Sequence, residues 1–175
     1  MTFLLIAISY LSWSQDVENE VNWLSFEEAI AMNQKQPKKI LVDVYTDWCG
    51  WCKKMDRTTY SHPKIVSYIN DHYYAVKLNA EMKDTVQLGS QLFVNENPTQ
   101  RRSPHQLAVS LLGGKMGYPS TVFLDEKVEL LNPPISGYLS AERIEPILYF
   151  FGDNIYSGKK MSWEEFQKQF ESKID

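Results

Sequence analysis

Two kinds of hydrophobic pattern alternate along this chain. Short apolar runs rich in β-branched residues predict buried strands over residues 39–45 and 73–78. Two further strands, over 120–125 and 128–131, flank a turn at 126–127 and predict a hairpin. Apolar residues at helical spacing predict helices over residues 24–32, 50–60, 64–71, 82–93, 105–112, 141–151 and 162–173.

The order of these elements predicts the fold class. Strands that alternate with helices and then form a hairpin indicate a mixed α/β sheet with helices on both faces. Ser25 and Glu28 have the spacing of a capping box and mark the start of the first helix. Pro146 lies inside a predicted helix and should either kink it or mark a late start.

The composition fits one domain. A chain of 175 residues, 43% of them hydrophobic, is long enough for one well-buried core and too short to favour two. The net charge of −4 argues against a nucleic acid or an anionic membrane surface as the main partner.

The first residues are apolar and uncharged. An apolar run at residues 3–8 precedes the small residues Ser12 and Ser14, which resembles a secretory signal peptide over 1–14 and a polar leader over 15–22. The run is too short to span a bilayer. No Lys or Arg lies near Met1, so two alternatives stay open: a true start further upstream, or a hydrophobic first element of the fold. The signal-peptide interpretation predicts export.

The strongest chemical signal is Cys49-Gly50-Trp51-Cys52, which contains the only two cysteines of the chain. A predicted strand runs into a predicted helix at this point, so Cys49 should lie among the unpaired N–H groups of the helix N-terminus, where thiolate is favoured. A disulfide that closes so short a loop contributes little as a purely structural bridge. The spacing therefore predicts a redox-active dithiol.

No metal site is expected. Two thiolates cannot build a four-cysteine zinc site, and His62, His72 and His105 fit no common zinc spacing with them. We expect the three histidines at surface or turn positions.

Several separate segments resemble the thioredoxin superfamily over residues 22–151. They are Leu41-Val42-Asp43, the motif from Trp48 to Lys53, Val76-Lys77-Leu78-Asn79, Gly117-Tyr118-Pro119-Ser120-Thr121 and Gly137-Tyr138-Leu139-Ser140. Thr46-Asp47-Trp48-Cys49 and Ser61-His62-Pro63 are most similar to exported bacterial thioredoxin-like proteins, including the C-terminal domain of the membrane reductant conductor of the Dsb system. The resemblance implies a thioredoxin fold over residues 23–151.

The chain departs from a minimal thioredoxin at three places. The dipeptide Gly50-Trp51 stands where thioredoxin has Gly-Pro. The stretch between Asn79 and Pro119 is longer, by an expected extra helix and a polar loop over 95–104. Residues 152–175 form an extension, expected to be helical and to fold back on the domain.

The resemblance assigns roles to four residues. Cys49 is the expected nucleophile and Cys52 the resolving cysteine. Asp43 matches the family's buried proton acceptor, whose pKa burial should raise, and Lys77 matches the residue that pairs with it. An ordinary ion-paired core carboxylate remains the alternative for Asp43.

The expected substrate surface surrounds the dithiol. Pro119 matches the family's cis-proline, which presents backbone to an extended substrate and blocks stray metal binding, while Tyr118 shapes the groove. An ordinary trans turn is the alternative. We expect Gly50 and an exposed Trp51 to contact substrate, with Trp48 packed against the domain.

The favoured function is reduction of protein disulfides in the periplasm by a monomer without any cofactor beyond the dithiol. The Gly50-Trp51 dipeptide contains no histidine to stabilise thiolate, which favours a reductase or isomerase over a strong oxidant. An exported reductant needs recharging, so a membrane electron donor of the Dsb-conductor type is the expected partner. A disulfide oxidase or isomerase, and a redox-inactive binding module, remain alternatives.

Overall fold

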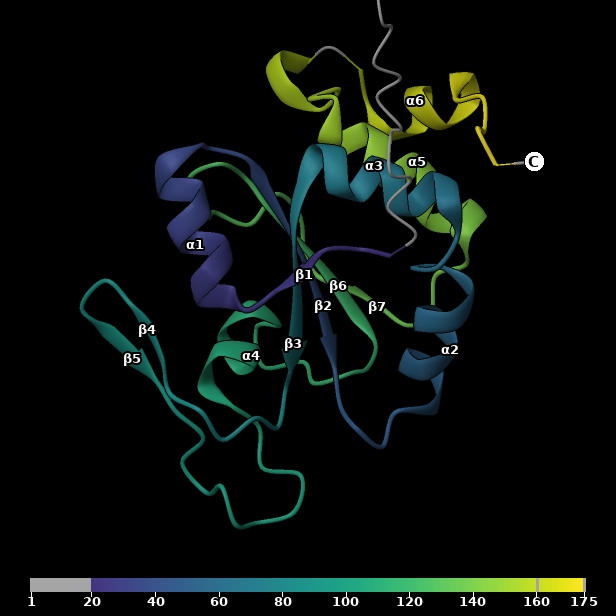
Figure 1. Cartoon of the computed structure of the whole chain (residues 1–175). Helices are drawn as coiled ribbons and strands as arrows, with labels where there is room; N and C mark the ends of the chain where they lie inside the picture. The colour runs from purple at the N-terminus through teal and green to yellow at the C-terminus, as the bar shows by residue number, and fades with distance from the viewer. Residues whose placement is uncertain (1–19, 160, 175) are drawn as a thin grey trace, which may run out of the picture.

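The structure is a computed structural model that describes residues 20–159 and 161–174. A five-stranded mixed sheet lies at the centre of the protein (Figure 1). Its strand order is β1-β3-β2-β6-β7. The strands are β1 (Trp23–Leu24), β2 (Lys39–Tyr45), β3 (Tyr73–Asn79), β6 (Ser120–Leu124) and β7 (Ile135–Ser136). β1, β3 and β2 are parallel, whereas β6 runs antiparallel to β2 and β7. The predicted mixed α/β class is confirmed.

The predicted signal peptide and most of the predicted leader lie outside the described residues.

Helices cover both faces of the sheet (Figure 1). Successive side chains of a strand point to opposite faces, so Ile40 and Val42 pack with α1 (Phe26–Lys35) and α4 (Gln106–Leu111). Leu41 instead joins the cluster on the other face, which includes residues of α2 (Gly50–Thr58), α3 (Pro63–His72) and α5 (Ala141–Gly152).

The helix starts follow the sequence closely. The Ser25 hydroxyl accepts the Glu28 N–H, and the Glu28 carboxylate accepts the Ser25 N–H, which completes the predicted capping box. α5 begins at Ala141 and continues past Pro146, so the alternative of a late start is wrong.

The helix predicted over residues 82–93 does not form. The segment is a hairpin of β4 (Val86–Leu88) and β5 (Gln91–Phe93), with Val86 opposite Phe93. Gly89 takes a φ of 59° in the two-residue turn between them, a conformation that suits glycine and turns the chain back. The insertion is therefore a hairpin and a loop ahead of α4, which lies close to the helix predicted over 105–112.

The strand predicted over residues 128–131 is also wrong. Only Leu130 makes an isolated bridge, to Leu124, and β6 pairs instead with β7. The Asp125 side chain accepts the N–H groups of Lys127 and Glu129, which bends this stretch into a turn.

The C-terminal extension folds back on α5. After a short 3-10 turn (η1, Ser157–Lys159), α6 (Trp163–Gln169) places the rings of Trp163 and Phe166 5.2 and 5.4 Å from that of Phe150. Beyond α6, the Ser172 hydroxyl and the Lys173 N–H both donate to the buried Glu145 carboxylate, each at 2.6 Å. Within the described residues, no helix combines the length and apolar character that crossing a bilayer requires.

Candidate active site

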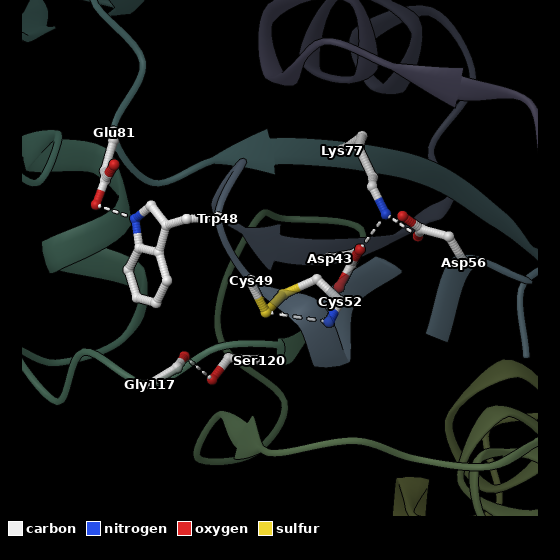
Figure 2. Close-up of a disulfide and its surroundings, with 9 residues drawn as sticks. All are labelled: Asp43, Trp48, Cys49, Cys52, Asp56, Lys77, Glu81, Gly117 and Ser120. Carbon is white, nitrogen blue, oxygen red and sulfur yellow. Dashed lines mark hydrogen bonds and ion pairs between the residues drawn. A yellow bond between two sulfur atoms is a disulfide. The ribbon is translucent and has the colours of Figure 1, made fainter. Parts of the chain in front are cut away.

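The Cys49–Cys52 disulfide lies at the N-terminus of α2 (Figure 2). Cys49 is the N-cap residue, and its sulfur accepts the Cys52 N–H at 3.0 Å. Both cysteines are buried, but Cys49 at 5% exposure is more accessible than Cys52 at 1%. In the reduced state the same N–H favours thiolate at Cys49.

A row of polar side chains interrupts the apolar sheet face beneath α2. In register, Asp43 of β2 lies between Lys77 of β3 and Thr121 of β6. The row two residues earlier on β2 is apolar, with Leu41 between Ala75 and Phe123 in the core cluster that contains Met55 of α2. Because side chains alternate between faces, Asp43, Lys77 and Thr121 point to the same covered side.

Asp43 is a buried, ion-paired carboxylate. Its side chain is 1% exposed, and its Oδ2 accepts a hydrogen bond from Lys77 Nζ at 2.5 Å. Burial raises the pKa of Asp43 to about 6, although the positive charge of Lys77 opposes the shift. A carboxyl group with this pKa can accept and release a proton near neutral pH.

Lys77 connects Asp43 to a second carboxylate, Asp56 of α2 (Figure 2). Burial lowers the pKa of Lys77, but the charges and hydrogen bonds of Asp43 and Asp56 outweigh burial and raise it overall. The Asp56 side chain is 42% exposed. Asp43, Lys77 and Asp56 therefore form a continuous series of contacts from the buried carboxylate to solvent.

Aromatic rings enclose the Lys77 ammonium. Its Nζ lies 4.9 Å from the ring centre of Trp23, 5.1 Å from that of Tyr45 and 5.4 Å from that of Tyr60. These contacts favour the charged form of the lysine. A pocket of about 330 Å³, lined by Trp23, Tyr60, Asp56 and Lys77 among others, opens beside this ion-paired group.

The outer side of the disulfide carries aromatic residues. The Tyr118–Pro119 peptide bond is cis, and the Ser120 hydroxyl donates to the Gly117 carbonyl at 2.8 Å within the same turn (Figure 2). Trp51 is 58% exposed, as expected, and Gly50 beside it is also exposed. Trp48 was expected to pack against the domain, yet it is 51% exposed.

Trp48 is held by residues of the insertion and of the cis-proline turn. Its indole N–H donates to Glu81 at 2.9 Å (Figure 2), and its ring meets Tyr118 edge-on at 6.0 Å. The Arg102 guanidinium lies 4.7 Å from the ring centre. The insertion thus reaches the neighbourhood of the disulfide.

Sequence reasoning missed three residues near the site. Asp56 follows Cys52 by four residues, and that helical spacing was a usable signal that both share one face. Glu81 and Arg102 lie in segments far from the motif along the chain, and no local pattern relates either of them to Trp48.

The histidines do not gather at the site. His105 was expected at the surface but is buried, where its Nδ1 accepts the Leu107 N–H as the N-cap of α4. Within the described part of the chain, no group of three or more His, Cys, Asp or Glu side chains could hold a metal ion.

Fold and site together define a thioredoxin-fold protein with a Cys-x-x-Cys disulfide at a helix N-terminus. The family model Thioredox_DsbH, described as "Protein of unknown function, DUF255", matches residues 7–146. The chain belongs to this thioredoxin-like family, as the sequence resemblance predicts.

Individual relatives agree with this assignment. The chain is 27% identical over 123 residues to the "Thiol:disulfide interchange protein DsbD" of Photorhabdus laumondii subsp. laumondii, an alignment that covers 70% of this chain and 18% of the relative. It therefore spans less than a fifth of that relative. Over the aligned residues the chain is thus similar to part of a thiol-disulfide interchange protein, in agreement with the family assignment.

Solved structures show the same fold. A structure titled "DsbH Oxidoreductase" aligns with a TM-score of 0.51 at 16% identity and covers 89% of this chain and 96% of its own. A thioredoxin-fold protein from Helicobacter pylori aligns with a TM-score of 0.57 at 16% identity, over 76% of this chain and 80% of its own.

Proposed function

We propose that this chain reduces disulfides of partner proteins. The Cys49 thiolate attacks one sulfur of the partner disulfide, a mixed disulfide forms, and the other partner sulfur leaves as a thiolate. The Cys52 thiolate then attacks the Cys49 sulfur, which closes the Cys49–Cys52 disulfide and releases the second partner thiolate. Two electrons pass from this chain to the partner.

The observation that carries this proposal is the buried Asp43 carboxylate with its pKa of about 6. Cys52 is itself buried and cannot lose its proton directly to solvent. Asp43 takes this proton as general base, and Lys77 holds the carboxylate in place while Asp56 links the group to solvent.

Two features support the reducing direction. The dipeptide Gly50-Trp51 supplies no positive charge to stabilise the Cys49 thiolate. A negative charge on Asp43, under the same helix that carries both sulfurs, disfavours thiolate further. A dithiol whose thiolate is poorly stabilised gives up electrons more readily, because strong oxidants are those whose reduced form is stabilised.

The substrate surface of the proposal comprises Trp48, Gly50, Trp51, Tyr118 and Pro119. An extended partner segment lies along the backbone before the cis-proline, and the exposed indoles cover its apolar atoms.

The proposed setting is the periplasm, with a membrane electron donor of the Dsb-conductor type and a monomeric chain. The apolar, uncharged segment at residues 1–14 and the similarity to thiol-disulfide interchange proteins named DsbD support export. A reductant in an oxidising compartment must be recharged from a reducing one.

Two matched variants test the mechanism. We expect Cys52→Ser to accumulate mixed disulfides with partner proteins, because the intermediate on Cys49 cannot be resolved. Cys49→Ser is the matched control, because it also replaces one cysteine sulfur by oxygen. This variant should trap no mixed disulfide. Equal trapping by both variants, or none by either, would contradict the assignment of nucleophile and resolving cysteine.

The reduction potential tests the direction. Equilibration of the Cys49–Cys52 pair with a defined thiol buffer should give a reduction potential of about −270 mV, as in thioredoxin. A reduction potential of about −120 mV would make the chain an oxidant instead.

A further inference from the structure

Two tryptophans, each with a cation against its ring, flank the redox motif. Trp48 immediately precedes Cys49, and the Arg102 guanidinium lies 4.7 Å from its ring centre. Trp51 immediately precedes Cys52, and Lys54 Nζ lies 4.9 Å from its ring centre. Both rings are more than half exposed, so a partner that approaches the disulfide meets these two pairs first.

The cations of these pairs have no carboxylate partners. Within residues 20–159 and 161–174, no ion pair involves Arg102, Lys54 or Arg57, whereas the buried Lys39 and the half-buried Lys77 are both paired. Lys54 lies instead between two rings, 4.8 Å from the centre of Tyr138 as well as beside Trp51. Together with Trp48 and Trp51, the residues Lys54, Arg57 and Arg102 form a rim beside the disulfide. The positive charge of this rim is available to a partner.

The Trp51 side of the rim is hollowed. Gly50, Trp51, Lys54 and Arg57 line a shallow pocket of about 320 Å³ at the start of α2. A pocket with an indole wall and two cationic side chains suits an acidic side chain with an apolar stem.

The Trp48 side is placed by the inserted loop. Two buried hydrogen bonds between Asn95 and Ser103, of 2.7 and 2.8 Å, close the loop across its base. Arg102, next to Ser103, takes a left-handed backbone conformation with a φ of 61°. The loop therefore fixes the backbone from which the Arg102 side chain extends to Trp48.

Two carboxylates lie near this rim as well. Glu81 is occupied by the indole N–H of Trp48, and Asp47 is exposed in the turn before the motif. With Glu81 and Asp47 counted, the three cations Lys54, Arg57 and Arg102 leave a local net charge of about +1 on a chain whose net charge is −4.

We propose that the rim formed by Trp48, Trp51, Lys54, Arg57 and Arg102 binds an extended acidic segment of the partner protein. The segment carries the reacting cysteine between Asp or Glu residues on both sides, so that its carboxylates pair with Arg102 at one end and with Lys54 and Arg57 at the other. This inference rests on the proposed function and adds the substrate class.

Short peptides test the inference directly. Three symmetrical disulfide dimers of one peptide are compared, identical except that the two residues on each side of the cysteine are Glu, Gln or Lys. The reduced protein should reduce the Glu dimer roughly five- to tenfold faster than the Gln dimer, and the Lys dimer most slowly. Added salt should bring the three rates together.

Protein variants assign the preference to the rim. In Lys54→Gln/Arg102→Gln the ratio of the Glu rate to the Gln rate should fall to about one. Lys35→Gln/Lys168→Gln removes the same charge from exposed positions on α1 and α6 and should keep the ratio.

The outcomes separate this inference from the proposed function. Reduction of the uncharged 2-hydroxyethyl disulfide reports the dithiol chemistry alone, so its absence would overturn the proposed function. Reduction of that compound at a normal rate, with equal rates for the Glu and Gln dimers or a faster Lys dimer, would overturn the acidic-segment inference alone.

Discussion

Asp43 and Glu145 are both carboxylates with 1% exposure, yet their surroundings differ. Asp43 contacts Lys77, which contacts a partly exposed second carboxylate. Glu145 accepts its hydrogen bonds from Ser172 and the Lys173 N–H, both in the C-terminal extension. Burial alone therefore does not identify a catalytic carboxylate. The contacts of Asp43 agree with the proton transfer proposed for it, whereas the contacts of Glu145 with the docked C-terminal extension favour a structural role.

The sharpest test of this contrast is the reaction rate. Asp43→Asn should slow release of the mixed disulfide about 10²- to 10³-fold at neutral pH, because Cys52 loses its general base. Rapid-quench measurement of a single turnover isolates this step. The matched change Glu145→Gln should react at the wild-type rate, and an equal loss in both variants would remove the distinction.

The pH dependence of stability is the next largest effect. The pKa of Asp43 is about 6 in the folded protein, whereas that of an aspartate in the unfolded chain is 3.8, so the folded state binds this proton more tightly. Its contribution to stability is full below about pH 4 and is lost as the pH rises through about 6, a change on the order of 3 kcal/mol.

Urea unfolding of the oxidised protein at pH 4 and pH 7.5 measures this loss as a difference in the free energy of unfolding. In Asp43→Asn, the part of this difference that comes from Asp43 should be absent. Glu145→Gln should leave the loss in place. If the Asn variant retains the full pH dependence, another group is responsible.

Glu145 should matter for stability alone. Glu145→Ala leaves the Ser172 hydroxyl and the Lys173 N–H without their acceptor, and we expect a loss of about 1–3 kcal/mol in the free energy of unfolding. Peptide reduction by the folded variant should stay at the wild-type rate. A catalytic defect at unchanged stability would assign the two carboxylates the opposite roles.

The smallest effect concerns the link to solvent. The negative charge of Asp56 helps to raise the pKa of Asp43, so Asp56→Asn should lower it. The pH profile of the resolving step should shift to lower pH, while Asp71→Asn on α3 should leave it in place. An unchanged profile in Asp56→Asn would mean that the two carboxylates are not coupled.

The parts of the fold that sequence predicted well are those with local causes. The β2 run, the capping box at Ser25 and the cysteine turn each depend on neighbouring residues. The hairpin at 86–93 was missed because Val86, Leu92 and Phe93 also suit a helix, and only the positive φ of Gly89 decides between the two.

The site was predictable only as far as motif and family resemblance extend. Cys49 and Cys52 follow from spacing, whereas Asp43 and Lys77 needed the resemblance to a known family. Glu145 looks like an ordinary helix-surface carboxylate until the C-terminal extension is placed over it. Arg102 lies in a long inserted loop and is far from Trp48 in the sequence. Contacts between residues so far apart leave no periodic pattern in the sequence.

The low exposure of Cys49 has a consequence for selectivity. At 5% exposure, Cys49 is more accessible to a flexible stretch of partner chain than to a compact surface. A disulfide inside a folded domain reaches such a recessed residue only after local unfolding. Under the proposed function, the site would therefore discriminate by the flexibility of the partner, with disulfides in flexible segments reduced faster than those inside folded domains.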